Sequence, residues 1–154
     1  MADLSISSAD TLRPDFVKLH VGGATAPDAL AELHREIAGS AGVIDPALFL
    51  SELLARQSLG GNCLDQDIAL PHVRTKAVNR IVLAMGRSER GVVFDPDHRQ
   101  IRLILLIGVP RAATTEYLRW VSGIARRLRT SGVRQALLGA TSLHEFNEAW
   151  ANTS

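Results

Sequence analysis

Residues 101–109, IRLILLIGV, form an almost continuous apolar run that ends at Pro110. A strand with one face in water alternates apolar and polar residues, whereas an unbroken run of β-branched and aliphatic residues is typical of a strand covered on both faces. We therefore expect this segment to be the central strand of a sheet that helices cover on both faces.

Shorter segments upstream of this run also favour strands. FVKLHV, residues 16–21, alternates apolar and polar residues, and IALP at 68–71 and IVLAMG at 81–86 are apolar runs of β-type residues. The segment FDPDHRQ, residues 94–100, has the composition of a turn. We expect the three apolar segments to complete the sheet around the central strand.

The remaining segments have the apolar periodicity and capping residues of helices. We predict helices at 26–38 with Thr25 as cap, from Pro46 to about Arg56 with Asp45 as cap, after Thr114 as cap, at 132–138 and from Ser142 onward. In the helix from Thr114, the residues expected to face inward are Leu118, Val121, Ile124, Ala125 and Leu128. Interspersed strands and helices indicate an α/β fold in one domain, 13–154, after a loose lead-in at 1–12.

Composition and charge narrow the function classes. The 154 residues carry a formal net charge of +1, which favours neither nucleic acid nor a membrane surface as a partner. Cys63 is the only cysteine, so no internal disulfide is possible and a reducing compartment is indicated. The N-terminus lacks a signal-peptide pattern, and the longest apolar run is too short to span a bilayer. We expect a soluble cytoplasmic protein with no membrane insertion.

Several site motifs with well-defined chemistry are absent from the sequence. It contains no GxxxxGK[ST] phosphate loop, no GxGxxG after a strand, no HExxH or paired Cys/His spacing, and no GxSxG elbow. We therefore expect no cofactor, no metal site and no serine nucleophile.

One histidine stands out, in the segment DIALPHVRTK at 67–76. His72 follows Pro71 directly after an apolar run, so we expect it on a loop, where side chains commonly carry chemistry. A neutral imidazole nitrogen is a good nucleophile, and arginines such as Arg56 and Arg74 can stabilise a transferred phosphoryl group. The residues alone leave a structural role open, in which backbone groups satisfy the imidazole ring.

Two segments resemble a known family. RQSLGGNCLDQDIALPHVR, residues 56–74, aligns without a gap with the pattern RE-x-LGSTGIG-x-G-IA-[IL]-PH-x-R of the enzyme IIA domains of the fructose, mannitol and nitrogen-regulatory branch of the bacterial phosphotransferase system. VPRAATTEYL, residues 109–118, resembles this family's VP-x-x-AT-x-EHL. The resemblance runs from about Phe16 to Trp150 and implies a mixed sheet flanked by helices, and the function of a phosphocarrier.

The resemblance also implies roles for individual residues. His72 would accept a phosphoryl group from HPr or its nitrogen-branch counterpart, and Arg56 would contact that group. Tyr117 takes the place of the family's second site histidine and would donate a hydrogen bond. The residues expected to bind the phosphoryl group or a partner are Arg74, Gly60, Gly61 and Asn62.

Recipients implied by the resemblance are a sugar permease's IIB domain or, in the nitrogen branch, a regulated kinase or transporter. Because the sequence carries no attached membrane, IIB or HPr-like segment, we favour the nitrogen-regulatory type. No metal or nucleotide is required, since the donor and the acceptor are both protein histidines.

The loop before His72 departs from the family pattern, because GNCLDQD stands in place of STGIG-x-G. Asp65 and Asp67 would repel an incoming phosphate if they pointed toward His72. An alternative is therefore an enzyme IIA-like binding module that has lost phosphotransfer. A third hypothesis is an unrelated α/β enzyme that uses His72 as a general base.

Overall fold

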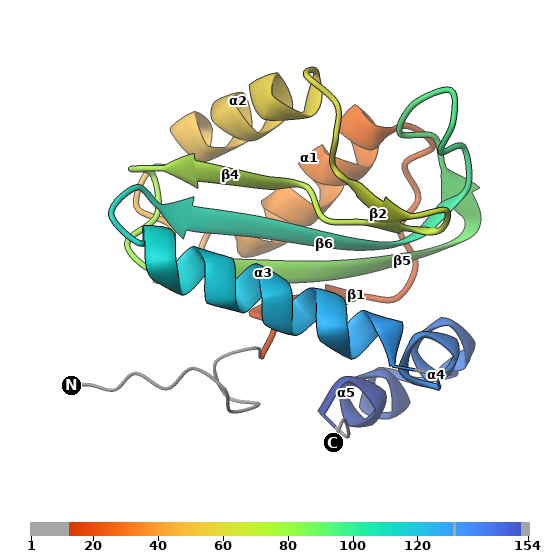
Figure 1. Ribbon diagram of the computed structural model, residues 1–154. Helices are drawn as coiled ribbons and strands as arrows, with labels where there is room; N and C mark the ends of the chain where they lie inside the picture. Colours follow the sequence, from red (N-terminus) through yellow and green to blue (C-terminus); the bar gives the residue numbers. More distant parts are fainter. Residues whose placement is uncertain (1–12, 131, 152–154) are drawn as a thin grey trace. The chain divides into compact units, whose positions relative to one another are not determined.

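The computed structural model describes residues 13–130 and 132–151, so the predicted lead-in at 1–12 lies outside the described residues (Figure 1). The chain forms two compact units. The sheet unit spans Pro14–Ala112, and the helical unit contains Arg13 and the described residues from Ala113 onward. Within the described ranges, no helix is long and apolar enough to cross a membrane.

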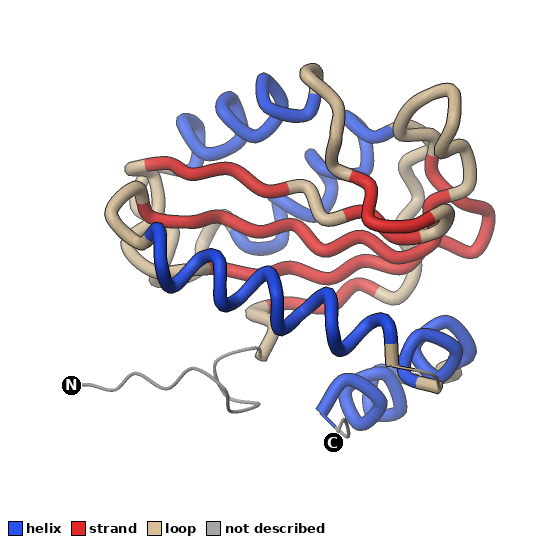
Figure 2. Tube along the Cα trace, in the orientation of Figure 1, coloured by secondary structure: helices blue, strands red, loops and turns tan. Residues whose placement is uncertain are grey.

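The sheet unit contains a six-stranded mixed sheet with β6 at its centre (Figure 2). The strand order is β1-β5-β6-β3-β2, and β4 also pairs with β6. β6 is antiparallel to β5 and parallel to β3 and β4, while β1 is parallel to β5. The strands are β1 (Phe16–Lys18), β2 (Cys63–Asp65), β3 (Ile68–Ala69), β4 (His72–Thr75), β5 (Val82–Val92) and β6 (Ile101–Pro110).

β6 has the central position that its apolar run predicts. Ile104 and Leu106 belong to the main core cluster, and the residues that alternate with them, Leu103 and Leu105, are also fully buried. Burial of each such side chain contributes about 1.5–3 kcal/mol to folding. Both faces of this strand are therefore covered, which confirms the prediction.

Two helices of the sheet unit begin and end close to their predicted bounds. α1 (Ala26–Ile37) packs against β5, and α2 (Pro46–Gln57) packs against β4 and against α1 (Figure 1). Thr25 Oγ1 and Asp45 Oδ1 accept hydrogen bonds from backbone N–H groups in the first turns. Each helix also has a proline in its first turn, whose missing N–H would be unpaired there in any case. Local sequence thus determines both helix starts.

The helical unit contains α3 (Thr114–Arg129), α4 (Val133–Gly139) and α5 (Leu143–Ala151). The prediction of Thr114 as a cap is wrong, because Ala113 holds that position without a side-chain hydrogen bond. The prediction that Leu118 faces inward is also wrong, because 58% of it is exposed. The buried positions repeat every four residues, at Trp120, Ile124 and Leu128, and Leu118 lies off that stripe.

The close approach of α2 to β6 depends on a glycine. A Cβ on Gly108 would lie 2.7 Å from Phe49 Cζ and 3.0 Å from Val82 Cγ2. We expect Gly108→Ala to lower the free energy of unfolding by about 1–3 kcal/mol, because the fully buried Phe49 ring would have to move. Urea unfolding measures this change. Gly39→Ala is the control, because its Cβ meets nothing within 4 Å, and an equal loss in both variants would contradict the expectation.

Candidate functional site

His72 is the first residue of a strand, and the prediction that places it on a loop is wrong. β3 and β4 pair with β6 in one continuous register, with Ile68 opposite Leu103 and His72 opposite Ile107. Between them the Ile107 N–H donates to the Pro71 carbonyl at 2.9 Å, so the proline interrupts the pairing without displacing the chain. The sheet thereby holds the half-buried His72 side chain at a defined position.

The imidazole of His72 is oriented by the backbone two residues earlier. Its Nδ1 lies 2.7 Å from the Leu70 carbonyl oxygen. A carbonyl oxygen only accepts hydrogen bonds, so Nδ1 carries the proton and Nε2 of the neutral ring carries the lone pair. A hydrogen bond to a backbone carbonyl is the contact expected of a histidine with a structural role. At His72 the same bond leaves the lone pair of Nε2 available for nucleophilic attack.

Leu70 also anchors the loop that precedes β2. Its N–H donates to the Asn62 carbonyl at 2.7 Å, which continues the pairing of β2 with β3. The Asn62 side chain is 4% exposed, and its Nδ2 donates to Gln57 Oε1 at the end of α2. The backbone of Leu70 therefore bonds both residues: its N–H donates to Asn62, the predicted loop residue, and its carbonyl accepts from the His72 ring.

Arg56 holds the start of this loop, where the chain leaves α2. Its Nη1 donates to the Gly60 carbonyl at 2.7 Å, immediately after α2. Gly60 and Gly61 have φ values of +79° and +81°, in the region that glycine adopts at no steric cost. The structure therefore assigns a loop-holding contact to Arg56 and a conformational role to the two glycines. The predicted contact of these three residues with a phosphoryl group stays a prediction.

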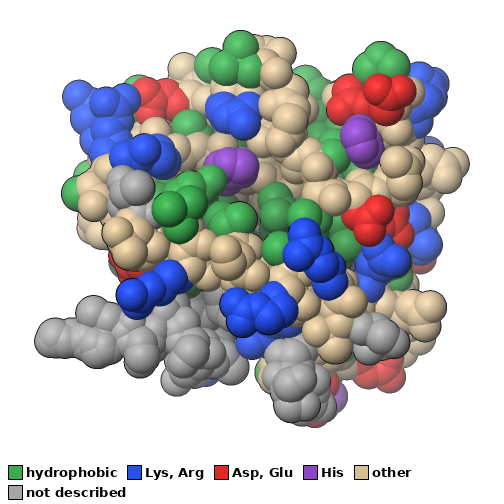
Figure 3. All heavy atoms as spheres, viewed as in Figure 1, with side chains coloured by type: hydrophobic (Ala, Val, Ile, Leu, Met, Phe, Trp, Pro, Cys, Tyr) green, Lys and Arg blue, Asp and Glu red, His purple; other side chains and the backbone are tan. Residues whose placement is uncertain are grey.

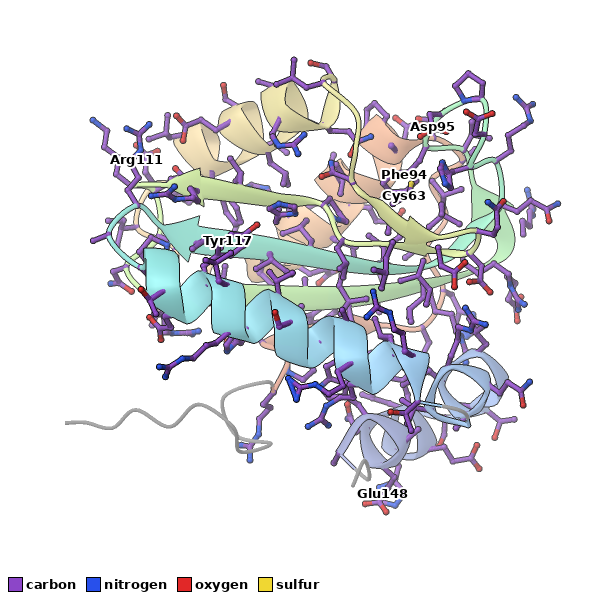
Figure 4. The ribbon with its side chains drawn as sticks, viewed as in Figure 1. Cys63, Phe94, Asp95, Arg111, Tyr117 and Glu148 are labelled. Carbon is purple, nitrogen blue, oxygen red and sulfur yellow. The ribbon has the colours of Figure 1, made fainter. Side chains whose placement is uncertain are left out.

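Arg74 lies two residues after His72 on β4, so both side chains project from the same face of that strand. The Arg74 Nη2 donates to the Arg111 carbonyl at 2.8 Å. The Arg111 Nη2 in turn lies 3.8 Å from Glu52 Oε2. Basic side chains gather over this end of β4 and β6 in Figure 3, and Figure 4 labels Arg111 there. Arg74 and Arg111 therefore place positive charge on the sheet beyond His72.

The altered loop folds as a hairpin that keeps its two aspartates away from His72. β2 and β3 pair antiparallel, and the Asp67 carbonyl accepts from the N–H groups of Arg102 and Leu103. Asp67 therefore lies at the level of Arg102, five residues before Ile107, the partner of His72. At about 3.3 Å per residue, the Cα atoms of Asp67 and His72 are about 16 Å apart. The exposed Asp65 lies opposite Ile68, at the same end of β3.

Tyr117 belongs to the helical unit. It is half-buried on α3, and its N–H donates to the Ala113 carbonyl at 2.9 Å in the first turn (Figure 4). Its predicted role as a hydrogen-bond donor to the phosphoryl group stays a prediction.

Comparison with known proteins identifies the family. Residues 10–152 match the family model described as phosphoenolpyruvate-dependent sugar phosphotransferase system, EIIA 2. The chain belongs to this family. This EIIA domain is therefore a phosphocarrier of the phosphotransferase system, and the hypothesis of an unrelated α/β enzyme is wrong.

Individual relatives agree with this assignment. The EIIA domain is 30% identical over 151 residues to the fructose-specific EIIA component of Haloferax volcanii, covering 96% of this chain and 97% of that protein. It matches the crystal structure of nitrogen regulatory protein IIA-Ntr from Neisseria meningitidis with a TM-score of 0.75 at 27% identity, covering 88% and 92% of the two chains. The Escherichia coli mannitol IIA, solved in complex with phosphorylated mannitol IIB, shares the fold with a TM-score of 0.74 at 22% identity, covering 88% and 93%. The mixed sheet with five helices, predicted from the sequence, is thus confirmed.

The two backbone-bonded histidines should differ in tautomer. We expect the neutral His72 ring to carry its proton on Nδ1, because the Leu70 carbonyl accepts from that nitrogen. His34 is an internal control, because its Nε2 lies 2.9 Å from the Pro46 carbonyl oxygen and should carry the proton instead. Long-range ¹H–¹⁵N correlation spectra at alkaline pH distinguish the two forms. An Nε2–H tautomer at His72 would contradict the assigned hydrogen bond.

Proposed function

We propose that this EIIA domain is a cytoplasmic phosphocarrier of the nitrogen-regulatory type that accepts its phosphoryl group on His72 Nε2. The observation that carries the proposal is the 2.7 Å contact between His72 Nδ1 and the Leu70 carbonyl. This contact places the ring proton on Nδ1, so that Nε2 is the nucleophilic nitrogen.

The transfer step runs between two imidazole nitrogens. The lone pair on His72 Nε2 attacks the phosphorus of the donor phosphohistidine in line, a new N–P bond forms, and the donor N–P bond breaks. The electron pair of the broken bond returns to the donor imidazole. Positive charge develops on the His72 ring as the new bond forms, and the Leu70 carbonyl oxygen, which accepts from Nδ1–H, stabilises this charge.

Arginine side chains supply charge for the phosphoryl oxygens in this proposal. Arg56 is held at the Gly60 carbonyl through Nη1, and a guanidinium has five N–H donors. The others can bind oxygens of the transferred group. Arg74 projects from the same face of β4 as His72 and adds positive charge on the path of an incoming partner. Tyr117 is proposed as a further hydrogen-bond donor.

The phosphodonor in this proposal is HPr or its nitrogen-branch counterpart. The likeness to the Neisseria meningitidis IIA-Ntr supports the nitrogen-regulatory type, with a regulated kinase or transporter as the partner that senses the phosphorylation state. The likeness to the Haloferax volcanii fructose-specific component supports a second candidate, in which a sugar IIB domain receives the phosphoryl group. Two measurements separate these candidates. One is the rate of phosphoryl transfer from each of the two donors to this domain, and the other is phosphoryl transfer from this domain to a fructose IIB domain.

The assignment of His72 is tested by reconstituted phosphorylation. With phosphoenolpyruvate, enzyme I and either donor, we expect the wild type to gain one acid-labile phosphoryl group by intact mass, and His72→Ala to gain none. ³¹P and ¹⁵N NMR should place the group on Nε2. His144→Gln, on the exposed start of α5, is the matched control and should be phosphorylated like the wild type. A folded wild type that takes no phosphoryl group from either donor would favour the binding module.

The placement of the two aspartates predicts that they do not impede the transfer step. Asp67 is about two Debye lengths from His72 at physiological ionic strength, and Asp65 lies at the same end of β3. We expect the double variant Asp65→Asn and Asp67→Asn to change the phosphorylation rate at saturating donor by less than about twofold. Arg56→Gln should slow that rate about a hundredfold, as expected on removing one donor to a developing anion. A large acceleration in the aspartate variant would show instead that the altered loop suppresses transfer.

A further inference from the structure

Three side chains of the kinds that bind metal ions lie together beside the β2–β3 hairpin. They are Cys63 on β2, and Asp95 and His98 in the segment between β5 and β6. Figure 4 labels Cys63 and Asp95. One ligand atom from each residue lies within 4.8 Å of both others, and all three residues are half-buried. In Figure 3, acidic side chains and a histidine lie together on the surface over this segment.

The turn that carries two of these residues is held by its own backbone. The His98 N–H donates to the Asp95 carbonyl at 3.1 Å, and the Phe94 N–H donates to the His98 carbonyl at 2.9 Å. The Asp97 N–H donates to Asp95 Oδ1 at 2.9 Å, which orients the carboxylate. The Phe94 side chain packs against the core of the sheet unit and anchors the turn to the sheet (Figure 4). Two of the three residues, Asp95 and His98, are therefore held close together by the turn itself.

The spacing of the three atoms suits a tetrahedral metal site. With metal–ligand distances of about 2.0–2.3 Å, the ligand atoms of a tetrahedral zinc site lie about 3.3–3.6 Å apart. His98 Nδ1 lies 2.9 Å from Asp95 Oδ1. The Cys63 sulfur, one ring nitrogen of His98 and one carboxylate oxygen of Asp95 all lie within 4.8 Å of one another. Shifts of about an ångström, within the reach of side-chain rotation, convert this arrangement into three corners of a tetrahedron.

We propose that Cys63, Asp95 and His98 bind a divalent transition-metal ion, with Zn²⁺ as the preferred occupant and water as the fourth ligand. One sulfur, one nitrogen and one oxygen ligand suit Zn²⁺ rather than Mg²⁺ or Ca²⁺, which prefer oxygen alone. On binding, the Cys63 thiol and His98 Nδ1 each release a proton to solvent, the neutral His98 ring keeps its proton on Nε2, and Nδ1 and the thiolate coordinate the ion.

The same residues have a metal-free description, in which His98 and Asp95 form an ion pair beside an inert thiol. Burial, and in addition the nearby Asp95 carboxylate, raise the pKa of Cys63 to about 11. The thiol is therefore mostly protonated near neutral pH and reacts slowly with alkylating agents. The two descriptions differ in what happens when metal is added, which makes the proposal testable.

Cobalt substitution tests the proposal on the purified, chelator-treated protein. Because Cys63 is the only cysteine, any thiolate-to-Co²⁺ charge-transfer band in the near ultraviolet must arise from it. We expect one Co²⁺ per chain with this band, and its displacement by Zn²⁺. Cys63→Ser should lose the band, and both Cys63→Ser and His98→Gln should bind Zn²⁺ at least about tenfold more weakly than wild type. The exposed His144→Gln is the control and should bind like the wild type.

A second measurement needs no variant and so does not depend on whether a variant folds. Saturating Zn²⁺ should slow the alkylation of Cys63 in the wild type by more than about tenfold, because the ion occupies the sulfur. Equal alkylation rates with and without Zn²⁺, absence of the charge-transfer band, or equal Zn²⁺ affinity in wild type and Cys63→Ser would each overturn the proposal. Neither measurement involves phosphotransfer. A negative result for the metal site is therefore distinct from a failure of the proposed function.

Discussion

The structure depends on the hydrogen bonding of β6 along both of its edges. This strand is buried on both faces, so its backbone N–H and C=O groups have no access to water and each must pair with a neighbouring strand. β5 satisfies one edge in antiparallel pairing, and β3 and β4 share the other edge in parallel pairing. For the second edge to stay paired, the chain must continue along β6 past Pro71. This requirement places His72 opposite Ile107 and the hairpin turn five residues earlier along β6.

The elements that could be predicted from sequence are those specified by local signals. Thr25 and Asp45 cap α1 and α2 as their positions indicate, and the apolar run of β6 reveals its burial. β2 and β4 could not be predicted, because they have only three and four residues, too few to show a clear β pattern, and β4 is mostly polar. Their strand conformation comes from tertiary pairing, which no local pattern encodes.

The candidate site likewise has features that the sequence predicts and features that only the fold determines. The sequence predicts His72 and Arg56 as site residues, whereas no sequence pattern indicates which imidazole nitrogen is protonated. That assignment rests on one carbonyl, at Leu70, whose direction is set by the break between β3 and β4. Cys63 and His98 are also brought together only by the fold, because they lie 35 residues apart in the chain. Spacing rules for metal sites therefore could not detect them.

The hairpin turn at Asp65–Asp67 has a consequence for how partners approach. Two aspartates at the far end of β3 from His72 are too distant to affect bond making, but they contribute to the field that a charged protein meets while diffusing toward the surface. Arg74 and Arg111, at the opposite end of the sheet, also contribute to that field. We therefore expect the aspartates that replace glycines to act on the association rate. They favour partners with a basic rim, and their influence declines as ionic strength rises.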